Sequence, residues 1–178
     1  LFHDVAKPHV REKVNGKWRF HGHEAASAEL AEEIMGRLKL GKDLIRTVTN
    51  LIKHHMISYD SRWSDGAIRH FIRRVGQADI MDLIAFRRAD LQAYGQAGQE
   101  PALLNELEAR IKDQIKGSFA MNTRDLAISG HKVMEILGVE QGPAVGNILR
   151  NLMETVTDHP ETNNEKGLIA LLEQMKKI

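Results

Sequence analysis

The stretch HEAASAELAEEIMGRLKL, residues 23–40, decides the class of fold that this sequence predicts. It spaces Leu30, Ile34 and Leu38 four residues apart, which puts them on one face of a helix. Further helices are predicted at residues 42–56, 64–76, 78–95 and 101–117. Only four prolines interrupt the chain, and long alternating β-branched runs are absent. The sequence therefore predicts an all-α fold.

The residues before this stretch are predicted to be mostly loop. FHDVA, residues 2–6, is interpreted as the last turns of a helix, and residues 7–22 follow as a loop punctuated by proline and glycine. Asn15-Gly16 inside this loop is a favoured two-residue turn, so a small hairpin is expected there.

The chain changes character in its last third. Residues 118–130 have the composition of a linker, and three short helices are expected beyond it. Ser129 is a favoured N-cap for the first of these helices, and Pro143 suits the first turn of the second. Thr162 and Glu165 have the spacing of a capping box at the start of the third.

These features predict a larger helical bundle followed by a smaller helical domain. The boundary is placed around residues 117–124, and the sequence contains no internal repeats or low-complexity tracts. The predicted parts are a first domain at 1–97, a connecting helix and linker at 98–120, and a second domain at 121–178.

The composition favours a soluble cytoplasmic protein. The 178 residues are 42% hydrophobic and 28% charged, which is enough to bury a core. No run of about 18 apolar residues could span a membrane, and the first residues do not resemble a signal peptide. The absence of cysteine excludes disulfides, thiolate catalysis and cysteine-based zinc sites. The net charge of +1 gives no overall attraction to nucleic acid, so any such contact must depend on local patches.

A histidine and an aspartate, His3 and Asp4, stand side by side near the start of the sequence. Both can ligate a divalent cation, but the pair alone is a weak signal. Asp90 strengthens it, because a carboxylate on the apolar face of the helix at 78–95 is expensive unless it is paired. That face comprises Ile80, Leu83, Ile84, Arg87, Asp90, Leu91 and Tyr94. Two interpretations stay open: Asp90 pairs with Arg87, or it reaches a site shared with the His-Asp pair.

Four of the nine histidines cluster at His21, His23, His54 and His55. A histidine at a helix end is often only a cap, because the helix dipole favours a cation there. Helical bundles also build metal sites from facing helices, so His23 and His54 are further candidate ligands. A ligand set without cysteine suits Mg²⁺, Mn²⁺, Fe or Ni²⁺, and such an ion could activate water against a phosphoester.

Basic residues gather in two consecutive predicted helices, at Arg69, His70, Arg73, Arg74, Arg87 and Arg88. Solvated helix surfaces often carry such charges, and that interpretation stays open. The functional interpretation is a track along a phosphate backbone, because arginine offers a bidentate fork to phosphate. A glycine-rich phosphate loop and a serine or threonine nucleophile elbow are both absent from the sequence.

LFHDVAKP at residues 1–8 resembles the signature of HD-domain phosphohydrolases, all-α metal proteins whose ligands are a first histidine, a His-Asp pair and a later aspartate. His3, Asp4 and Asp90 match the last three positions. GHEAASAELAEEIMGRLKL, LIKHHM, WSDGAIRHFIRRVG and LIAFRRAD resemble more narrowly the HD region of bacterial tRNA nucleotidyltransferases (CCA-adding enzymes) and poly(A) polymerases.

The last third of the chain extends this resemblance. DLAISGHKVMEILGVEQGPAVGNILRNLMETV, followed by NNEKGLIALL, is similar to the RNA-binding segment of that family. The resemblance implies an HD-type domain at 1–97 and an RNA-binding domain at 121–178. The family's nucleotidyltransferase motif and the first histidine of the HD signature have no match here, and Ala6 stands where many relatives have glycine. The expectation is a C-terminal fragment that begins inside an HD domain.

The favoured hypothesis is therefore the HD and RNA-binding portion of a tRNA nucleotidyltransferase or poly(A) polymerase. The resemblance implies that the intact protein adds nucleotides from CTP and ATP to tRNA 3′ ends, with tRNA or another RNA as partner and no membrane. Phosphate contacts are expected at Arg69, Arg73, Arg74 and Lys132. Which nucleotides are added, and the oligomeric state, are not predicted.

Two alternatives stay open. One is a free-standing metal-dependent phosphohydrolase acting on nucleotides or phosphodiesters. Its divalent ion, Mg²⁺, Mn²⁺ or Ni²⁺, would be bound by His3, Asp4 and Asp90, with His23 or His54 nearby. The other is a purely structural helical module in which Asp90 pairs only with Arg87.

Overall fold

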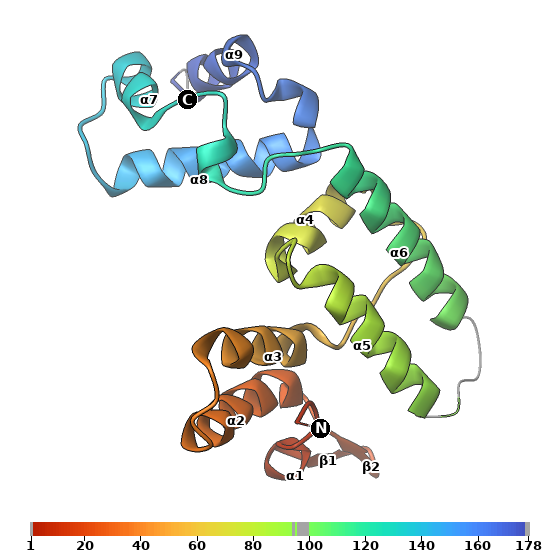
Figure 1. Ribbon diagram of the computed structural model, residues 1–178. Helices are drawn as coiled ribbons and strands as arrows, with labels where there is room; N and C mark the ends of the chain where they lie inside the picture. The colour runs from red at the N-terminus through yellow and green to blue at the C-terminus, as the bar shows by residue number, and fades with distance from the viewer. Residues whose placement is uncertain (1, 94, 96–99, 177–178) are drawn as a thin grey trace. The chain divides into compact units, whose positions relative to one another are not determined.

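Helices make up most of the described chain, which confirms the predicted all-α fold (Figure 1). The structure is a computed structural model that describes residues 2–93, 95 and 100–176. The helices are α1 (Lys7–Val10), α2 (His23–Arg37), α3 (Lys42–His54), α4 (Asp65–Val75), α5 (Ile80–Ala93), α6 (Glu100–Lys116), α7 (Gly130–Leu137), α8 (Pro143–Asp158) and α9 (Glu165–Met175). The other elements are the strands β1 (Glu12–Val14) and β2 (Lys17–Arg19) and the 3-10 turns η1 (Thr123–Asp125) and η2 (Pro160–Thr162).

The segment before α2 differs in part from its prediction. Residues 3–6 form turns, so the predicted end of a helix at 2–6 is wrong. The Ala6 amide donates to the Ser27 hydroxyl at 3.1 Å, and not to a backbone carbonyl as it would within a helix. The predicted hairpin is confirmed, because Asn15 and Gly16 both have positive φ angles, of 51° and 77°, between antiparallel β1 and β2.

The first compact unit comprises Leu1–Ser61 and Val75–Glu108. Within it α2 packs along α3, and a short loop joins the two helices. Their shared core consists of Ala28, Ala31 and Ile52, with Phe2 and Val48 packed against it. Because the loop reverses the chain direction, the start of α2 and the end of α3 come to lie side by side. That juxtaposition positions the site described below.

The apolar face predicted for the helix at 78–95 is confirmed on α5. Its buried residues are Ile80, Leu83, Ile84 and Leu91. Arg87 and Asp90 are half-buried on the same helix. Tyr94, which the sequence placed on this face, lies outside the described residues.

The second compact unit comprises Arg62–Arg74 and Ala109–Ile178. Its core is built from the linker and from α7, α8 and α9, through Ala120, Leu126, Ile128, Val133, Val145, Leu152, Met153, Val156, Leu168 and Leu172. Residues 118–129 form no α-helix, as the linker composition predicted, and Gly130 is the first residue of α7. Whether residues 1–97 and 121–178 are separate domains stays a prediction.

The helix starts in this unit follow the predicted caps in two cases of three. The Ser129 hydroxyl accepts from the backbone amide of Lys132, and Pro143 occupies the first turn of α8, which confirms both predictions. The capping box predicted from Thr162 is wrong, because the Asn164 side chain caps α9. The Thr162 hydroxyl instead donates to the carbonyl of His159 within the preceding turn, at 2.7 Å.

A glycine in the first turn of α9 is required by close packing. A Cβ added at Gly167 would lie 2.6 Å from the carbonyl oxygen of Thr162, which is backbone and cannot rotate away. We therefore expect Gly167→Ala to lower the free energy of unfolding by about 1–3 kcal/mol. Gly36→Ala in α2 is the matched control, because its Cβ would meet nothing within 4 Å. It should raise the stability by about 0.5–1 kcal/mol. Urea unfolding followed by circular dichroism measures both, and equal effects would contradict the prediction.

None of the helices in the described part of the chain is both long enough and apolar enough to cross a bilayer.

Candidate metal centre

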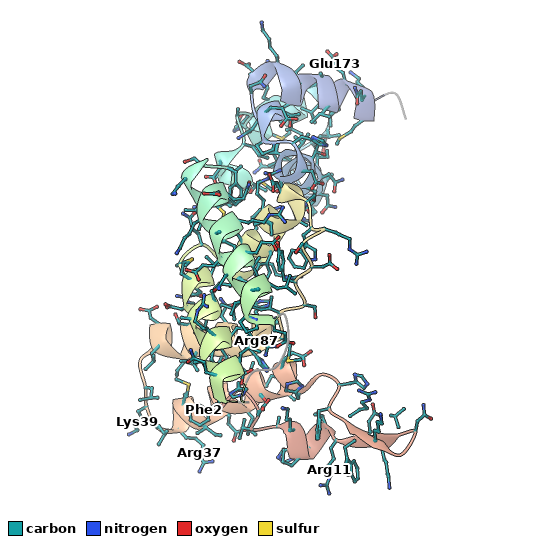
Figure 2. All side chains as sticks on the ribbon, turned by 90° about the vertical axis from the view of Figure 1, so that its right-hand side faces the viewer. Phe2, Arg11, Arg37, Lys39, Arg87 and Glu173 are labelled. Atoms are coloured by element: carbon teal, nitrogen blue, oxygen red, sulfur yellow. The ribbon has the colours of Figure 1, made fainter. Side chains whose placement is uncertain are left out.

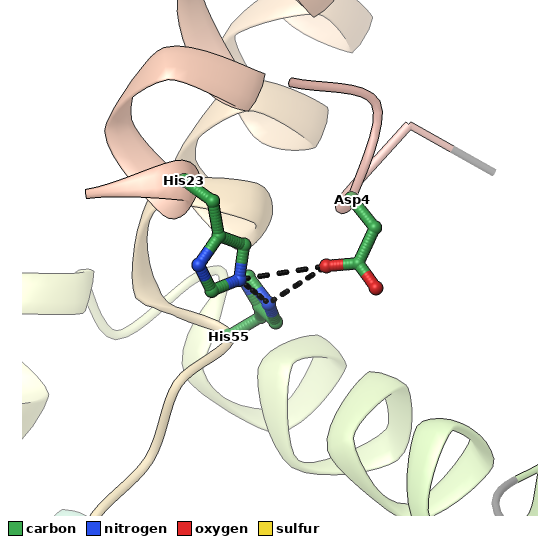
Figure 3. Close-up of side chains that lie close together, drawn as sticks. All are labelled: Asp4, His23 and His55. Carbon is green, nitrogen blue, oxygen red and sulfur yellow. Dashed lines mark hydrogen bonds and ion pairs between the residues drawn. The ribbon is translucent and has the colours of Figure 1, made fainter. Parts of the chain in front are cut away.

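Three potential metal ligands converge in the first compact unit, from three separate segments. Asp4 lies in the turns before α1, His23 is the first residue of α2, and His55 follows the last residue of α3. Figure 3 shows their side chains pointing toward one another. Among the described residues, no other group of three or more acidic or histidine side chains has its ligand atoms close enough together to hold one ion.

The separations of the ligand atoms fit a single metal ion. His23 Nε2 lies 3.4 Å from His55 Nε2 and 3.4 Å from Asp4 Oδ1, and His55 Nε2 lies 3.9 Å from Asp4 Oδ1. An ion with bonds of about 2.1 Å at roughly tetrahedral angles spaces its ligands by about 3.4 Å. The donor set of two imidazoles and a carboxylate suits a divalent transition ion.

Backbone carbonyls fix the orientation of both histidines. The Nδ1 of His23 lies 2.8 Å from the Phe20 carbonyl oxygen, and the Nδ1 of His55 lies 2.6 Å from that of Ile52. A carbonyl only accepts, so each Nδ1 must carry the donated hydrogen, and this leaves Nε2 as the ring atom available to a metal. The His23 and His55 residues are only 6% and 2% exposed. Two such Nε2 atoms facing a carboxylate create a concentration of negative potential that a bound cation would neutralise.

Asp4 and His55 are held in the protonation states that bind metal. Burial acts to raise the pKa of Asp4, but the 2.7 Å hydrogen bond from Lys7 and the nearby charges of His3, Lys7 and His23 outweigh it, so this pKa is lowered. The pKa of His55 is lowered too, and here burial is the main cause. The charges of His23 and His3 lower it further, while the hydrogen bond to the Ile52 carbonyl and the charge of Asp4 act in the opposite direction. The lowered pKa values favour an ionised Asp4 and a neutral His55 near neutral pH, as ligands require.

His3 and Asp90 lie beside these three ligands. His3 Nε2 is 3.3 Å from Asp4 Oδ2 and 3.3 Å from Asp90 Oδ1, and the rings of His3 and His55 meet edge-on at 5.2 Å between centroids. Asp90 also accepts a 2.8 Å hydrogen bond from Arg87. Asp90 therefore contacts both Arg87 and His3, and its membership of a shared metal site stays a prediction.

The structure thus brings together four residues that the sequence singled out: His3, Asp4, His23 and Asp90. It adds His55, which sequence reasoning did not propose as a ligand, and the group of three close ligands does not include its neighbour His54. A signal for His55 existed, since Val48, Ile52 and His55 follow one helical face and Ile52 is buried in the core. Their roles as metal ligands stay predictions.

The predicted phosphate-binding residues lie in the second unit and differ in their exposure and in the number of their hydrogen-bond partners. Arg69 is only 8% exposed and donates to Thr157 O, Asp158 O and Gln114 Oε1 at 2.6, 2.9 and 2.6 Å. Arg73 donates to the hydroxyl of Thr157 at 2.5 Å, and Lys132 pairs with Glu135 at 3.1 Å. Arg74 is exposed, with its guanidinium over the ring of Phe71. Arg73 and Arg74 also line one open depression, together with His70, Met121 and Glu154. Phosphate contact by any of them stays a prediction.

Comparisons with known proteins identify the family. Residues 15–172 match the family model described as "tRNA nucleotidyltransferase domain 2 putative". The chain is 31% identical over 175 residues to the CC-adding tRNA nucleotidyltransferase of Thermus thermophilus, covering 97% of this chain and 38% of that protein. It is also 31% identical over 163 residues to the A-adding tRNA nucleotidyltransferase of Deinococcus radiodurans, covering 86% of this chain and 36% of that protein.

No solved structure matches the chain. The chain spans little more than a third of the length of the two curated relatives, at 38% and 36%. The family model, however, covers most of the chain, and both relatives align along nearly all of it. The chain therefore belongs to the tRNA nucleotidyltransferase family.

Proposed function

We propose that this chain holds tRNA for an enzyme that adds nucleotides to the tRNA 3′ end from CTP or ATP. The observation that carries the proposal is the alignment of 97% of the chain with a CC-adding tRNA nucleotidyltransferase. The second relative is an A-adding enzyme at the same identity, 31%, so the nucleotide added by this protein is left open. A cytoplasmic location is part of the same proposal.

Four basic residues of the second unit are the proposed phosphate contacts: Arg69, Arg73, Arg74 and Lys132. Arg74 is the strongest of these, because it is exposed and borders a depression that it shares with Arg73. Lys132 can exchange its surface partner Glu135 for a phosphate at little cost, since exposed ion pairs are weak. Arg69 is the weakest, because its guanidinium already has three protein acceptors.

A salt titration of tRNA binding tests this proposal. The affinity of the chain for a labelled tRNA should fall by about tenfold or more between 50 and 200 mM KCl, because each phosphate contact releases counterions. Arg74→Ala should reduce the slope of log Kd against log salt by about 1. Arg37→Ala, at an exposed position of α2, is the control of equal charge and should leave the slope unchanged. A flat salt dependence would rule out contact with the phosphate backbone, and no preference for tRNA over duplex RNA of equal length would rule out specific recognition of tRNA.

We also infer that Asp4, His23 and His55 bind one divalent metal ion, with Mn²⁺ or Ni²⁺ preferred over Mg²⁺ because two ligands are imidazoles. Such an ion would supply Lewis-acid activation of a phosphate or of water. The ligand spacing and the two Nδ1 hydrogen bonds support this inference. The comparisons do not favour a free-standing phosphohydrolase, because both relatives are named as nucleotidyltransferases. The metal centre is therefore proposed as part of a tRNA-handling protein.

A further inference from the structure

The β1–β2 hairpin concentrates positive charge on an exposed ribbon. All six residues of its two strands are exposed. Residues 11–19 carry four cations, at Arg11, Lys13, Lys17 and Arg19, against the single anion Glu12, whereas the whole chain has a net charge of only +1. Figure 2 shows Arg11 beside the ribbon, with side chains extending outward around it. The hairpin is thus a local basic patch of the kind that a nearly neutral chain would need to contact nucleic acid.

An aromatic ring lies exposed among these cations. Trp18 is 54% exposed, the largest ring among the exposed hydrophobic residues of the described chain. Lys13 is its cross-strand partner, with the ammonium 5.9 Å from the ring centroid, and the Arg11 guanidinium carbon lies 4.9 Å from that centroid. Tryptophan exposed to this extent gains little from the core of its own protein, so its ring area is available to a partner.

The strand register separates the single anion from this ring. Lys13 and Trp18 form one cross-strand pair, whereas Glu12 pairs with Arg19 in the neighbouring pair. Neighbouring pairs point to opposite faces of a ribbon, so Glu12 lies on the face away from Trp18. The face of Trp18 therefore combines an aromatic ring with two cations, Arg11 and Lys13, and the opposite face adds Lys17 and Arg19.

We propose that the β1–β2 hairpin binds single-stranded RNA, with Trp18 stacking on an unpaired base and the surrounding cations contacting the phosphates. A positively charged track with an aromatic stacking platform is the recognition mode of unpaired nucleic acid, because only an unstacked base exposes its face. A duplex would offer phosphates to the cations but no free base to the ring. The identity of the RNA as tRNA rests on the proposed function, since the unpaired 3′ end and loops of a tRNA offer such bases.

The fluorescence of Trp18 tests the proposal directly. The chain has two tryptophans, and Trp63→Phe leaves Trp18 as the sole emitter while keeping an aromatic ring against Phe71. Titration with a 12-nucleotide RNA without secondary structure should quench this emission to saturation, because a stacked base quenches indole. The same RNA annealed to its complement should quench it little. Saturable quenching by the duplex alone, or none by the single strand, would overturn the proposal.

A second readout does not depend on the Trp63 variant. The anisotropy of a labelled 12-nucleotide RNA should show about tenfold weaker binding to Trp18→Ala, and a change of less than about threefold for Trp18→Phe, which keeps a stacking ring. Lys17→Ala with Arg19→Ala should flatten the salt dependence, whereas the equally charged control Arg37→Ala with Lys166→Ala should not. Unchanged affinity of Trp18→Ala would exclude stacking.

The two proposals fail differently. If tRNA binds with a steep salt dependence but Trp18→Ala binds it as tightly as the parent chain, the hairpin proposal is wrong and the proposed function stands. If the single-stranded RNA quenches Trp18 but tRNA gains nothing over that RNA, the hairpin proposal stands and tRNA is not its specific partner.

Discussion

Replacing His55 with alanine is expected to weaken the binding of Mn²⁺ or Ni²⁺ by more than about a hundredfold, since loss of a direct ligand should exceed the 10–100-fold loss seen for outer partners. The imidazole of His55 is the most buried of the three ligands, and its Nε2 lies 3.4 Å from that of His23 and 3.9 Å from Asp4 Oδ1. Its removal leaves one imidazole and one carboxylate, which hold transition ions weakly. Isothermal titration calorimetry with each ion gives the affinity, and metal analysis of the purified chain gives the stoichiometry, expected to be one ion per chain.

His54→Ala is the matched control for this variant. It removes the same side chain one residue earlier, at a position that the sequence also suggested as a ligand. The group of close ligand atoms contains His55 and not His54, so the control should keep its metal. The prediction is contradicted if His54→Ala loses the ion, or if His55→Ala retains it with unchanged affinity.

Asp90→Asn then separates a ligand from a neighbour. The Asp90 side chain is 8% exposed and pairs with Arg87 as well as lying 3.3 Å from His3. Neutralising it removes the partner of a half-buried arginine, so lower stability is expected whether or not a metal binds. A simultaneous loss of metal would show that Asp90, and with it the part of the site next to His3, contributes to metal binding. Unchanged metal content would confine it to the three central residues.

The helices of this protein could be predicted because their signal is local. Apolar residues at the helical period identified α2, α3, α5 and α6, and Ser129 and Pro143 identified two helix starts from single side chains. Two local predictions, the helix end at 2–6 and the capping box at Thr162, are wrong because other hydrogen-bond partners compete with the predicted ones. The Ala6 amide bonds Ser27, twenty-one residues away, and Asn164 rather than Thr162 accepts the hydrogen bond at the start of α9. Neither preference can be decided from residue spacing alone.

The site could be predicted in its residue types but not in its exact members. The His-Asp pair, His23 and Asp90 stand out in the sequence, yet the choice between two adjacent histidines depends on which side of the end of α3 faces α2. The arginines show a stronger limit. Arg69 and Arg74 look alike in the sequence, but one is buried against residues 88 and 89 positions away and the other is exposed. Only the fold distinguishes a structural arginine from one available to RNA.

Arg69→Met is expected to lower the free energy of unfolding of the second unit by about 3 kcal/mol or more, the largest effect on stability that we predict. The guanidinium of Arg69 donates to the carbonyls of Thr157 and Asp158, at the C-terminal end of α8, and the last turn of α8 has no basic residue of its own. A cation at this end satisfies carbonyls that the helix leaves unpaired and offsets the negative end of its dipole. Methionine fills a similar volume but removes the donor from the buried carbonyl of Thr157 and from the carbonyl of Asp158.

Arg74→Met provides the matched control, because it removes the same charge from the same helix at an exposed position. Its guanidinium lies 5.4 Å from the ring centroid of Phe71, and loss of this exposed cation–π interaction should cost less than about 1 kcal/mol. Urea unfolding followed by circular dichroism separates the two variants. Equal stability of both would show that the contacts of Arg69 with α8 contribute little.

The same pair of variants decides between the structural and the RNA-binding interpretation of Arg69. If Arg69 acts only within the protein, the folded fraction of Arg69→Met should bind tRNA with the salt slope of the parent chain, while Arg74→Met should lose about one unit of slope. The binding of Arg69→Met is measured without urea, at a temperature where the variant is folded. A reduced slope would mean that the guanidinium of Arg69 in the parent chain exchanges carbonyls for phosphate when RNA binds. That exchange would cost three protein hydrogen bonds, which is why a change confined to Arg74 is the expected result.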